Sequence, residues 1–342
     1  MDLSIVDIAP VRSGETATEA YEDTVELAQA AERLGYSRFW VAEHHGVSDA
    51  IASATPEVLI AHLAAKTDDI RVGSGTVLLN HYSPFKVAET FASLDALAPG
   101  RVDLGLGRAT GMPAVDRALG SGGPRQSAGD DHAAKIEETA RHVYDAYPDD
   151  HPYADIRIPR SADGVPEVWV LGSSPSSAKI AADLGLPYAF AAFIRPTVAA
   201  TALDTYRERF QPSEFDEGLD EPHSMLAANV ACAETDHEAA RLRASSEAAY
   251  QRMARGAFGP PPTVEEAVDE IGGVPEPTST SLAPSEWPRA ISGSPETVGT
   301  LLEEMTAQVG ADEVVVQNLI EDPEARIRSH ELIAEGVGID GR

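Results

Sequence analysis

Apolar and polar residues alternate along the first half of the chain in two patterns. Short apolar runs are typical of strands buried in a parallel sheet, and they occur at 3–8, 38–42, 70–78 and 101–106. Between these runs, apolar residues return every three or four positions, as on one face of a helix. This spacing predicts helices over 18–34, 56–66, 84–98 and 131–147.

The second half continues the same alternation. The predicted strands are 167–171, 187–193, 225–232 and 313–319. The predicted helices are 175–185, 196–210, 235–255, 295–309 and 322–335. Alternating strands and helices predict a parallel sheet, and eight repeats favour a closed (β/α)₈ TIM barrel over an open doubly wound sheet. We therefore predict an α/β fold with one TIM-barrel domain over residues 1–342.

The chain is longer than such a barrel needs. A barrel of this type takes about 250 residues, which leaves roughly 90 for insertions. We expect the insertions at about 148–166 and 257–292, and the second contains the proline-rich runs GPPPT and PEPTST. Such loops either cover the mouth of the barrel as lids or project from the surface, and composition alone leaves both alternatives open.

The charge balance narrows the class of partner. With 26 basic and 56 acidic residues, the formal net charge is −30. A surface this negative repels nucleic-acid backbones and anionic lipid headgroups, so we expect neither as a partner. Only four of the basic residues are lysines. We interpret this composition as adaptation to molar salt, where charges are strongly screened, and an acidic protein that binds a basic ligand is the alternative.

The cysteine count and the N-terminal sequence indicate the cellular compartment of the protein. The single cysteine, Cys232, cannot form an internal disulfide, and the N-terminal segment MDLSIVDIAP has no basic leader followed by an apolar run. No apolar stretch reaches the roughly 18 to 20 residues of a membrane helix. We therefore expect a cytoplasmic protein.

Functional residues of a TIM barrel lie at the carboxyl ends of its strands, and the first candidates follow the second strand. There Glu43, His44 and His45 are consecutive. Adjacent histidines at a strand end point in different directions, so one can serve the pocket as an acid or base while the other packs. Two structural histidines are the alternative. We predict no metal site, because no further cluster of ligands has the required spacing.

Two further strand ends are rich in glycine. Gly73, Ser74, Gly75 and Thr76 lie in the third strand, where glycine indicates either close approach of the backbone to a flat ligand or tight packing of the barrel wall. The fourth strand ends in GLGRATG, whose glycine spacing does not match a dinucleotide fingerprint. Arg108 beside small residues instead fits a clamp for phosphate or carboxylate.

A serine cluster follows the fifth strand, in LGSSPSSAK at 171–179. A helix that begins near Pro175 presents free N–H groups that suit a phosphate, although serine caps also occur without a ligand. Because Arg108 and the cluster at 173–177 follow neighbouring strands of the predicted barrel, we expect them to meet. Together they predict a phosphorylated cofactor.

Several long motifs in this order resemble the bacterial-luciferase-like flavin monooxygenases, which are (β/α)₈ barrels. The resemblance runs over nearly the whole chain, and the segments 212–224 and 257–292 have no counterpart. It is carried by WVAEHH, RVGSGTVLL, SPFKVAETFASLDALAPGRVDLGLGRATG and VLGSSPSSAKIAADLGLPYAFA.

The resemblance implies roles for individual residues. His44 matches the catalytic histidine beside the flavin ring. Gly75 and Thr76 match a pair that the family holds in a non-prolyl cis peptide against the isoalloxazine. Arg108 matches the arginine that binds the flavin phosphate.

The phosphate loop of the family matches Ser173, Ser174 and Ser177. Luciferase itself has a glutamate where Ser173 stands, so the contact at 173 is open. Asp7, by its position at the end of the first strand, and His45 are expected in the substrate pocket.

The resemblance implies an enzyme that uses reduced FMN and O₂ to oxygenate a small organic substrate. The chain shows no evident NAD(P)H site, so we expect a separate flavin reductase. An oxidoreductase that transfers hydride with F420 and a flavin-binding protein without catalysis are the alternatives. Because family members pair through the helices flanking the second and third strands, we also expect a homodimer.

Overall fold

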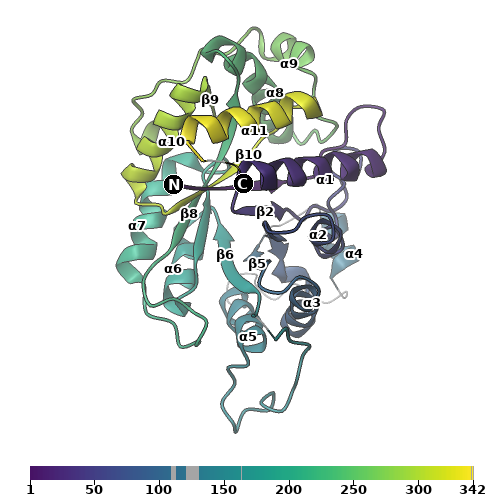
Figure 1. The fold of residues 1–342 in the computed structure, drawn as a ribbon, viewed down its shortest axis with the longest axis vertical. Coiled ribbons are helices and arrows are strands. Elements are labelled where there is room, and N and C mark those ends of the chain that lie inside the picture. The colour runs from purple at the N-terminus through teal and green to yellow at the C-terminus, as the bar shows by residue number, and fades with distance from the viewer. Residues whose placement is uncertain (109–112, 121–130, 163, 340, 342) are drawn as a thin grey trace.

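A closed parallel barrel forms the centre of the computed structural model (Figure 1). The structure describes residues 1–108, 113–120, 131–162, 164–339 and 341, and within these ranges eight strand positions close into a ring when β10 pairs with both β1 and β8. The strands are β1 (Asp2–Asp7), β2 (Arg38–Val41), β3 (Arg71–Ser74), β4 (Val77–Leu78), β5 (Val102–Gly107), β6 (Glu167–Gly172), β7 (Tyr188–Ala191), β8 (Ser224–Cys232), β9 (Ala290–Gly293) and β10 (Glu313–Gln317). The predicted (β/α)₈ barrel is confirmed.

Helices surround this barrel. They are α1 (Ala17–Leu34), α2 (Pro56–Ala64), α3 (Pro84–Leu97), α4 (Pro113–Leu119), α5 (His132–Tyr144), α6 (Pro175–Leu184), α7 (Ala199–Arg209), α8 (Asp236–Ala254), α9 (Val264–Ile271), α10 (Pro295–Val309) and α11 (Pro323–Val337). Local sequence fixes their ends. In α1, Thr16 and Glu19 form a capping box and Gly35 ends the helix with a φ of 84°, a conformation that favours glycine.

Three local predictions differ from the structure. The predicted strand 70–78 is divided into β3 and β4, which pair in succession along β5. Inside the segment 257–292, β9 pairs with the second half of β8 and continues the sheet beyond the point where β10 pairs. The helices α4 and α9 were not predicted. Each of these four elements has eight residues or fewer, so the hydrophobic period is too short to be read from the sequence.

The two expected insertions lie at opposite ends of the barrel. Residues 148–166 connect the end of α5 to the start of β6, so they lie at the amino ends of the strands, and Figure 1 shows them projecting beside α5. In contrast, residues 257–262 line one cavity together with Ile8 and Leu319, which follow β1 and β10 at the carboxyl ends. This part of the second insertion therefore reaches the mouth.

The strands bury two separate apolar layers. Side chains facing outward pack under the helices in one large cluster that includes Ile5 and Phe39. The alternate side chains face the barrel interior, where Val6, Trp40 and Trp169 belong to a second cluster. The edge-to-face contact of Trp40 and Trp169, with ring centroids 5.4 Å apart, fills the interior with packed side chains.

Below these tryptophans, a buried ion network closes the amino end of the barrel. Nη1 of Arg38 lies 2.9 Å from Asp103 Oδ2 and 2.9 Å from Glu167 Oε2, and its Nε lies 3.4 Å from Glu313 Oε2. Nε1 of Trp40 donates to Asp103 Oδ2 at 2.8 Å. One arginine from β2 therefore holds three carboxylates from three other strands.

Candidate functional site

Four neighbouring strand positions bring the predicted site residues to one arc of the mouth. In barrel order these are β2, the β3–β4 pair, β5 and β6, which are hydrogen-bonded in succession. Residues 43–45 follow β2, and the Gly75–Thr76 peptide separates β3 from β4. Arg108 follows β5 and the serines follow β6. The predicted adjacency of the Arg108 strand and the serine strand is confirmed.

His44 is held as a neutral imidazole. Its backbone N–H donates to the Ser53 carbonyl at 2.8 Å, and its ring is partly buried. Burial, with a smaller contribution from His45, lowers the pKa of His44 to about 4. Its Nδ1 is buried and has no hydrogen-bond partner within the described part of the chain. A buried polar atom normally has a partner, so this nitrogen is available to a bound molecule.

Glu43 connects the end of β2 by hydrogen bonds to β4 and to the residues that follow β4. Its Oε1 lies 2.5 Å from His45 Nε2 and accepts from Tyr82 Oη at 2.6 Å, and its Oε2 accepts from the Leu78 backbone N–H at 2.8 Å. The Glu43 side chain is buried. The carboxylate therefore joins the ends of two neighbouring strand positions, immediately next to His44. In the structure the His45 ring bonds to Glu43 within this network. That His45 contacts the substrate stays a prediction.

The peptide between Gly75 and Thr76 is cis, as the resemblance implies. A Cβ at Gly75 would lie 3.0 Å from Val6 Cγ2 and 3.1 Å from Trp40 Cβ, so this residue lies on the upper surface of the interior cluster. The Thr76 hydroxyl donates to the Gly105 carbonyl at 2.8 Å. This bond fixes the peptide to β5.

Two other glycines have a packing role. A Cβ at Gly73 would lie 2.5 Å from the Asp103 carbonyl oxygen, and a Cβ at Gly105 would lie 2.0 Å from the Ser74 carbonyl oxygen. Real Cβ atoms do not approach a neighbouring strand so closely. Of the two alternatives left by the sequence for the third strand, tight packing of the barrel wall accounts for Gly73, and Gly105 in the next strand is packed as tightly.

The serines form the start of α6. Ser174 is its N-cap, and its Oγ accepts from the Ser177 N–H at 3.5 Å. The Ser177 hydroxyl donates to the Ser174 carbonyl at 2.8 Å and lies 3.0 Å from Tyr188 Oη. Ser177 therefore supports the loop, while Ser173 is partly buried at its tip. Backbone N–H groups in the first turn of a helix suit a phosphate.

Arg108 is exposed at the end of β5, and the last three residues of its GLGRATG motif, 109–111, lie outside the described residues. His132, the first residue of α5, was not predicted as a site residue. Burial first, and then the charges of Arg108 and Lys135, lower the pKa of His132 to about 4. Three nitrogen-bearing side chains therefore gather at this side of the mouth, in a chain that is strongly acidic overall.

Asp7 does not lie in the pocket, and the prediction for it is wrong. Its Oδ2 accepts from Thr24 Oγ1 at 2.8 Å, and its Oδ1 lies 3.3 Å from Arg326 Nη1. These partners belong to α1 and α11. Asp7 faces the helix layer because its neighbours Val6 and Ile8 face the barrel interior, and side chains alternate along a strand.

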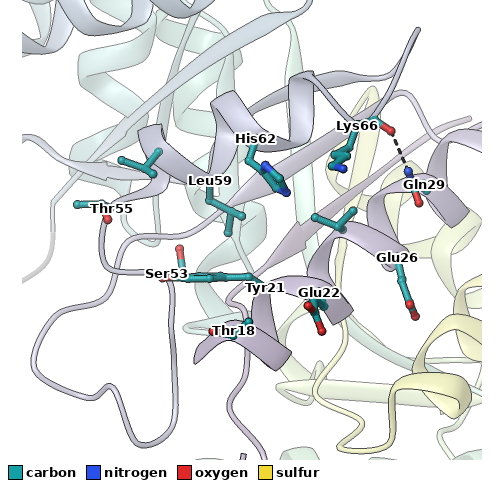
Figure 2. A pocket seen from close by; sticks show the side chains of 12 residues that line it. Thr18, Tyr21, Glu22, Glu26, Gln29, Ser53, Thr55, Leu59, His62 and Lys66 are labelled. Carbon is teal, nitrogen blue, oxygen red and sulfur yellow. Dashed lines mark hydrogen bonds between the residues drawn. The ribbon is translucent and has the colours of Figure 1, made fainter. Parts of the chain in front are cut away.

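A wide groove lies outside the barrel, between α1 and α2 (Figure 2). Its volume is about 710 Å³. Tyr21 and Glu26 of α1 face Leu59 and His62 of α2 across it, as Figure 2 shows. The groove is separate from the arc at the mouth, since it lies between two helices of the outer layer.

We expect stability to fall as pH decreases from about 6.5. Burial is the main cause that lowers the pKa of four histidines: His44 and His132 to about 4, His330 to about 3, and His142 in the same direction. The unfolded chain, with an ordinary histidine pKa of about 6.5, then binds protons that the folded chain does not. His223, whose pKa is raised first by its hydrogen bond to Glu313, has the opposite effect. The same holds for Asp23, Asp95 and Glu321, whose pKa is raised mainly by burial.

Thermal unfolding followed by circular dichroism at pH 7.5, 6.5, 5.5 and 5.0 checks this expectation. The lowest of these values stays above the ordinary carboxylate range, so histidines dominate the change. An unfolding midpoint that stays constant over this range would contradict it.

Two kinds of feature are absent from the described residues. They contain no group of three or more histidine, cysteine, aspartate or glutamate side chains arranged to hold a metal ion. They also contain no helix with the length and apolar character needed to cross a membrane.

A parallel barrel with polar side chains gathered at the carboxyl ends of its strands defines the class of α/β-barrel enzymes. Comparison with known proteins specifies the family. The family model described as luciferase-like monooxygenase matches residues 1–313. The chain therefore belongs to the luciferase-like monooxygenase family.

Individual relatives agree with this assignment. A luciferase-like monooxygenase of Escherichia coli is 36% identical, with 96% of this chain and 95% of that protein covered. An N-acetyl-S-alkylcysteine monooxygenase of Bacillus subtilis is 36% identical, with 98% of each chain covered. The crystal structure of apo-MsnO8 matches with a TM-score of 0.86 and 42% identity, over 100% of this chain and 99% of that one.

Proposed function

We propose that this protein is a flavin-dependent monooxygenase that uses reduced FMN and O₂ to oxygenate a small organic substrate. The observation that carries the proposal is the arc at the mouth. There His44, whose buried Nδ1 has no hydrogen-bond partner among the described residues, lies at the end of β2. The Gly75–Thr76 peptide, Arg108 and the start of α6 follow in the next strand positions.

The residues present fit such a cofactor. Arg108 and the first turn of α6 supply positive charge and backbone donors for a phosphate. The Gly75–Thr76 segment lies close on the interior cluster, because its glycine has no side chain to contact Val6 and Trp40, and a flat ring could lie against its backbone. The neutral imidazole of His44 can bond a polar atom of a flat ring. Reduced FMN, when bound, supplies the electrons and the site at which O₂ is activated.

The protein's own part is to position groups and to move a proton. With its pKa lowered to about 4, His44 is neutral near pH 7 and can accept a proton. Glu43 keeps the adjoining segment fixed through His45, Tyr82 and the Leu78 N–H. The apolar cluster beneath the mouth keeps water out of the barrel interior.

Relatives support a flavin supplied by a second protein. The oxygenase component of a flavin-dependent trigonelline monooxygenase from Acinetobacter baylyi is 37% identical over 103 residues, which is 30% of this chain. A protein named as one component of such a system works with another. We therefore propose that a separate reductase delivers reduced FMN to this protein.

Cofactor binding and oxygen consumption test the function. The purified protein is titrated with FMN and with F420, and oxygen uptake is then followed with chemically reduced FMN and candidate substrates. Tight FMN binding with substrate-dependent oxygen uptake is expected. Preference for F420 with hydride transfer would replace the proposal with an F420-dependent oxidoreductase. FMN binding without any oxygen uptake would replace it with flavin storage.

The substitution Arg108→Ala tests the phosphate clamp. We expect FMN affinity to fall about tenfold to a hundredfold, because a charge-assisted bond to the phosphate is lost. Riboflavin lacks the phosphate, so its affinity should be almost unchanged. Quenching of flavin fluorescence measures both. Equal losses for FMN and riboflavin would contradict the clamp.

We also propose a homodimer that pairs through the helices flanking β2 and β3. Val58 of α2, which lines the groove of Figure 2, is 66% exposed, and Leu97 at the end of α3 is 78% exposed, so each of these helices presents a large apolar side chain to solvent. Sedimentation equilibrium should give twice the chain mass, and Val58→Asp should give monomers. A monomeric wild-type protein would contradict this pairing.

A further inference from the structure

A second cavity lies at the mouth, on the side away from Arg108. It is bounded by Ile8 beyond β1, by Leu319 beyond β10, and by residues 257–262, which follow α8. A backbone bridge between Pro10 and Ile51 joins the loop after β1 to the loop that carries His44. Ile8 also packs on the cluster that fills the barrel interior. The cavity therefore adjoins the proposed reaction site.

The side chains that line the cavity are mostly apolar, and the charge among them is paired. Aliphatic, aromatic and proline side chains make up most of it, including Met253, Phe258 and three consecutive prolines at 260–262. The charged side chain in the lining is Arg252. Its guanidinium is 2.7 Å from Glu270 Oε2 and 3.3 Å from the Pro260 carbonyl oxygen, so its charge is already balanced. A charged group of a ligand would find no free partner here.

From this geometry we propose that the cavity binds an uncharged alkyl group of the substrate. This inference rests on the proposed function, because it names the class of substrate for the same mouth. The cavity holds about 90 Å³, less than the roughly 150 Å³ of an apolar cavity that accepts benzene. A short, unbranched chain fits this volume, whereas an aromatic ring does not.

Two partly exposed side chains at the rim favour binding of the alkyl group. Phe258 is 54% exposed and Met253 is 48% exposed, so both keep apolar surface in contact with water beside the cavity. A chain that enters the cavity removes part of both from water, and the gain grows with the apolar area buried. The prolines at 260–262 restrict the backbone of this wall, so little order is lost on binding.

Ligand series of increasing length test the proposal. Uncharged 2-alkanones from 2-butanone to 2-octanone are titrated into the purified protein by calorimetry, beside alkanoates of equal carbon number. We expect affinity for the ketones to rise about fourfold per methylene until the cavity is filled. The alkanoates should bind at least about tenfold more weakly, because their carboxylate meets no free cation.

Variants assign the effect to this cavity. Ala249→Phe introduces a ring that is larger than the cavity at a position that lines it, so it should block the cavity and abolish the dependence on chain length. Ala254→Phe is the matched control, because Ala254 is exposed on the same helix and outside the lining. Phe258→Ala, at an exposed position that tolerates change, should weaken the longer ketones about threefold or more.

FMN titration of the same preparations separates this inference from the proposed function. Wild-type binding of ketones without dependence on length, or unchanged dependence in Ala249→Phe and Phe258→Ala, would overturn the alkyl site even where FMN binds tightly. Dependence on length that both variants reduce supports the site, and it does so even if FMN fails to bind and the proposed function falls.

Discussion

Replacing His44 with alanine is expected to lower turnover about 10²- to 10⁴-fold, which is the range for loss of a general acid or base. The imidazole lies at the carboxyl end of β2, and its buried Nδ1 lacks a hydrogen-bond partner in the part of the chain that the structure describes. FMN binding should be nearly unchanged, because the proposed phosphate contacts lie on β5 and β6. Steady-state oxygen uptake and flavin titration measure the two quantities separately.

The pH profile gives a second readout for His44. With the pKa lowered to about 4, the wild-type kcat/KM should fall only when the pH approaches that value, as the imidazole becomes protonated. The alanine variant should lack this limb. His237→Ala, at an exposed histidine, is the control and should behave as wild type. Unchanged turnover in the His44 variant would show that another group moves the proton.

The substitution Arg38→Ala is expected to destabilise the fold by about 3 to 5 kcal/mol, the usual cost of removing one partner from a buried ion pair. Asp103, Glu167 and Glu313 would then face each other at the amino end of the barrel without their shared cation. Arg71 still reaches Asp103 at 2.5 Å and Glu167 at 3.3 Å, so part of the charge stays balanced.

Urea unfolding of wild type and variant measures this loss. Arg328→Ala is the matched control, because Arg328 pairs with Glu234 at 2.6 Å on the surface, where both side chains are more than half exposed. An exposed pair contributes about 0 to 1 kcal/mol. If Arg38→Ala and Arg328→Ala lose the same small amount, the network at the amino end does not hold the barrel together.

The barrel could be predicted from the sequence because long amphipathic helices and buried strands repeat in a fixed order. Elements that are too short to show a hydrophobic period could not be predicted in this way. The four residues of β9 show their role only through pairing with Asn229–Cys232 of β8, which is a contact distant in sequence. The error at Asp7 has another origin, since period-two alternation from Val6 already predicts that Asp7 faces outward.

Site residues on adjacent strands were also predictable, because strand order follows from chain order in such a barrel. Arg108 and Ser174 are examples. Side-chain networks between strands could not be predicted from the sequence. Glu43 was part of the motif around His44, but its bond to Tyr82, 39 positions later, depends on tertiary structure. His132 could be recognised as a candidate site residue only from the structure, in which the start of α5 lies near Arg108. The interpretation of the acidity as salt adaptation stays a prediction.

The segment 148–166 offers a practical use that follows from its place at the amino ends of the strands. A fluorescent dye or an affinity peptide inserted at its tip would be a barrel length away from the carboxyl-end mouth. Spectroscopic reporters could thus be attached to the enzyme without occupying the side through which small molecules enter.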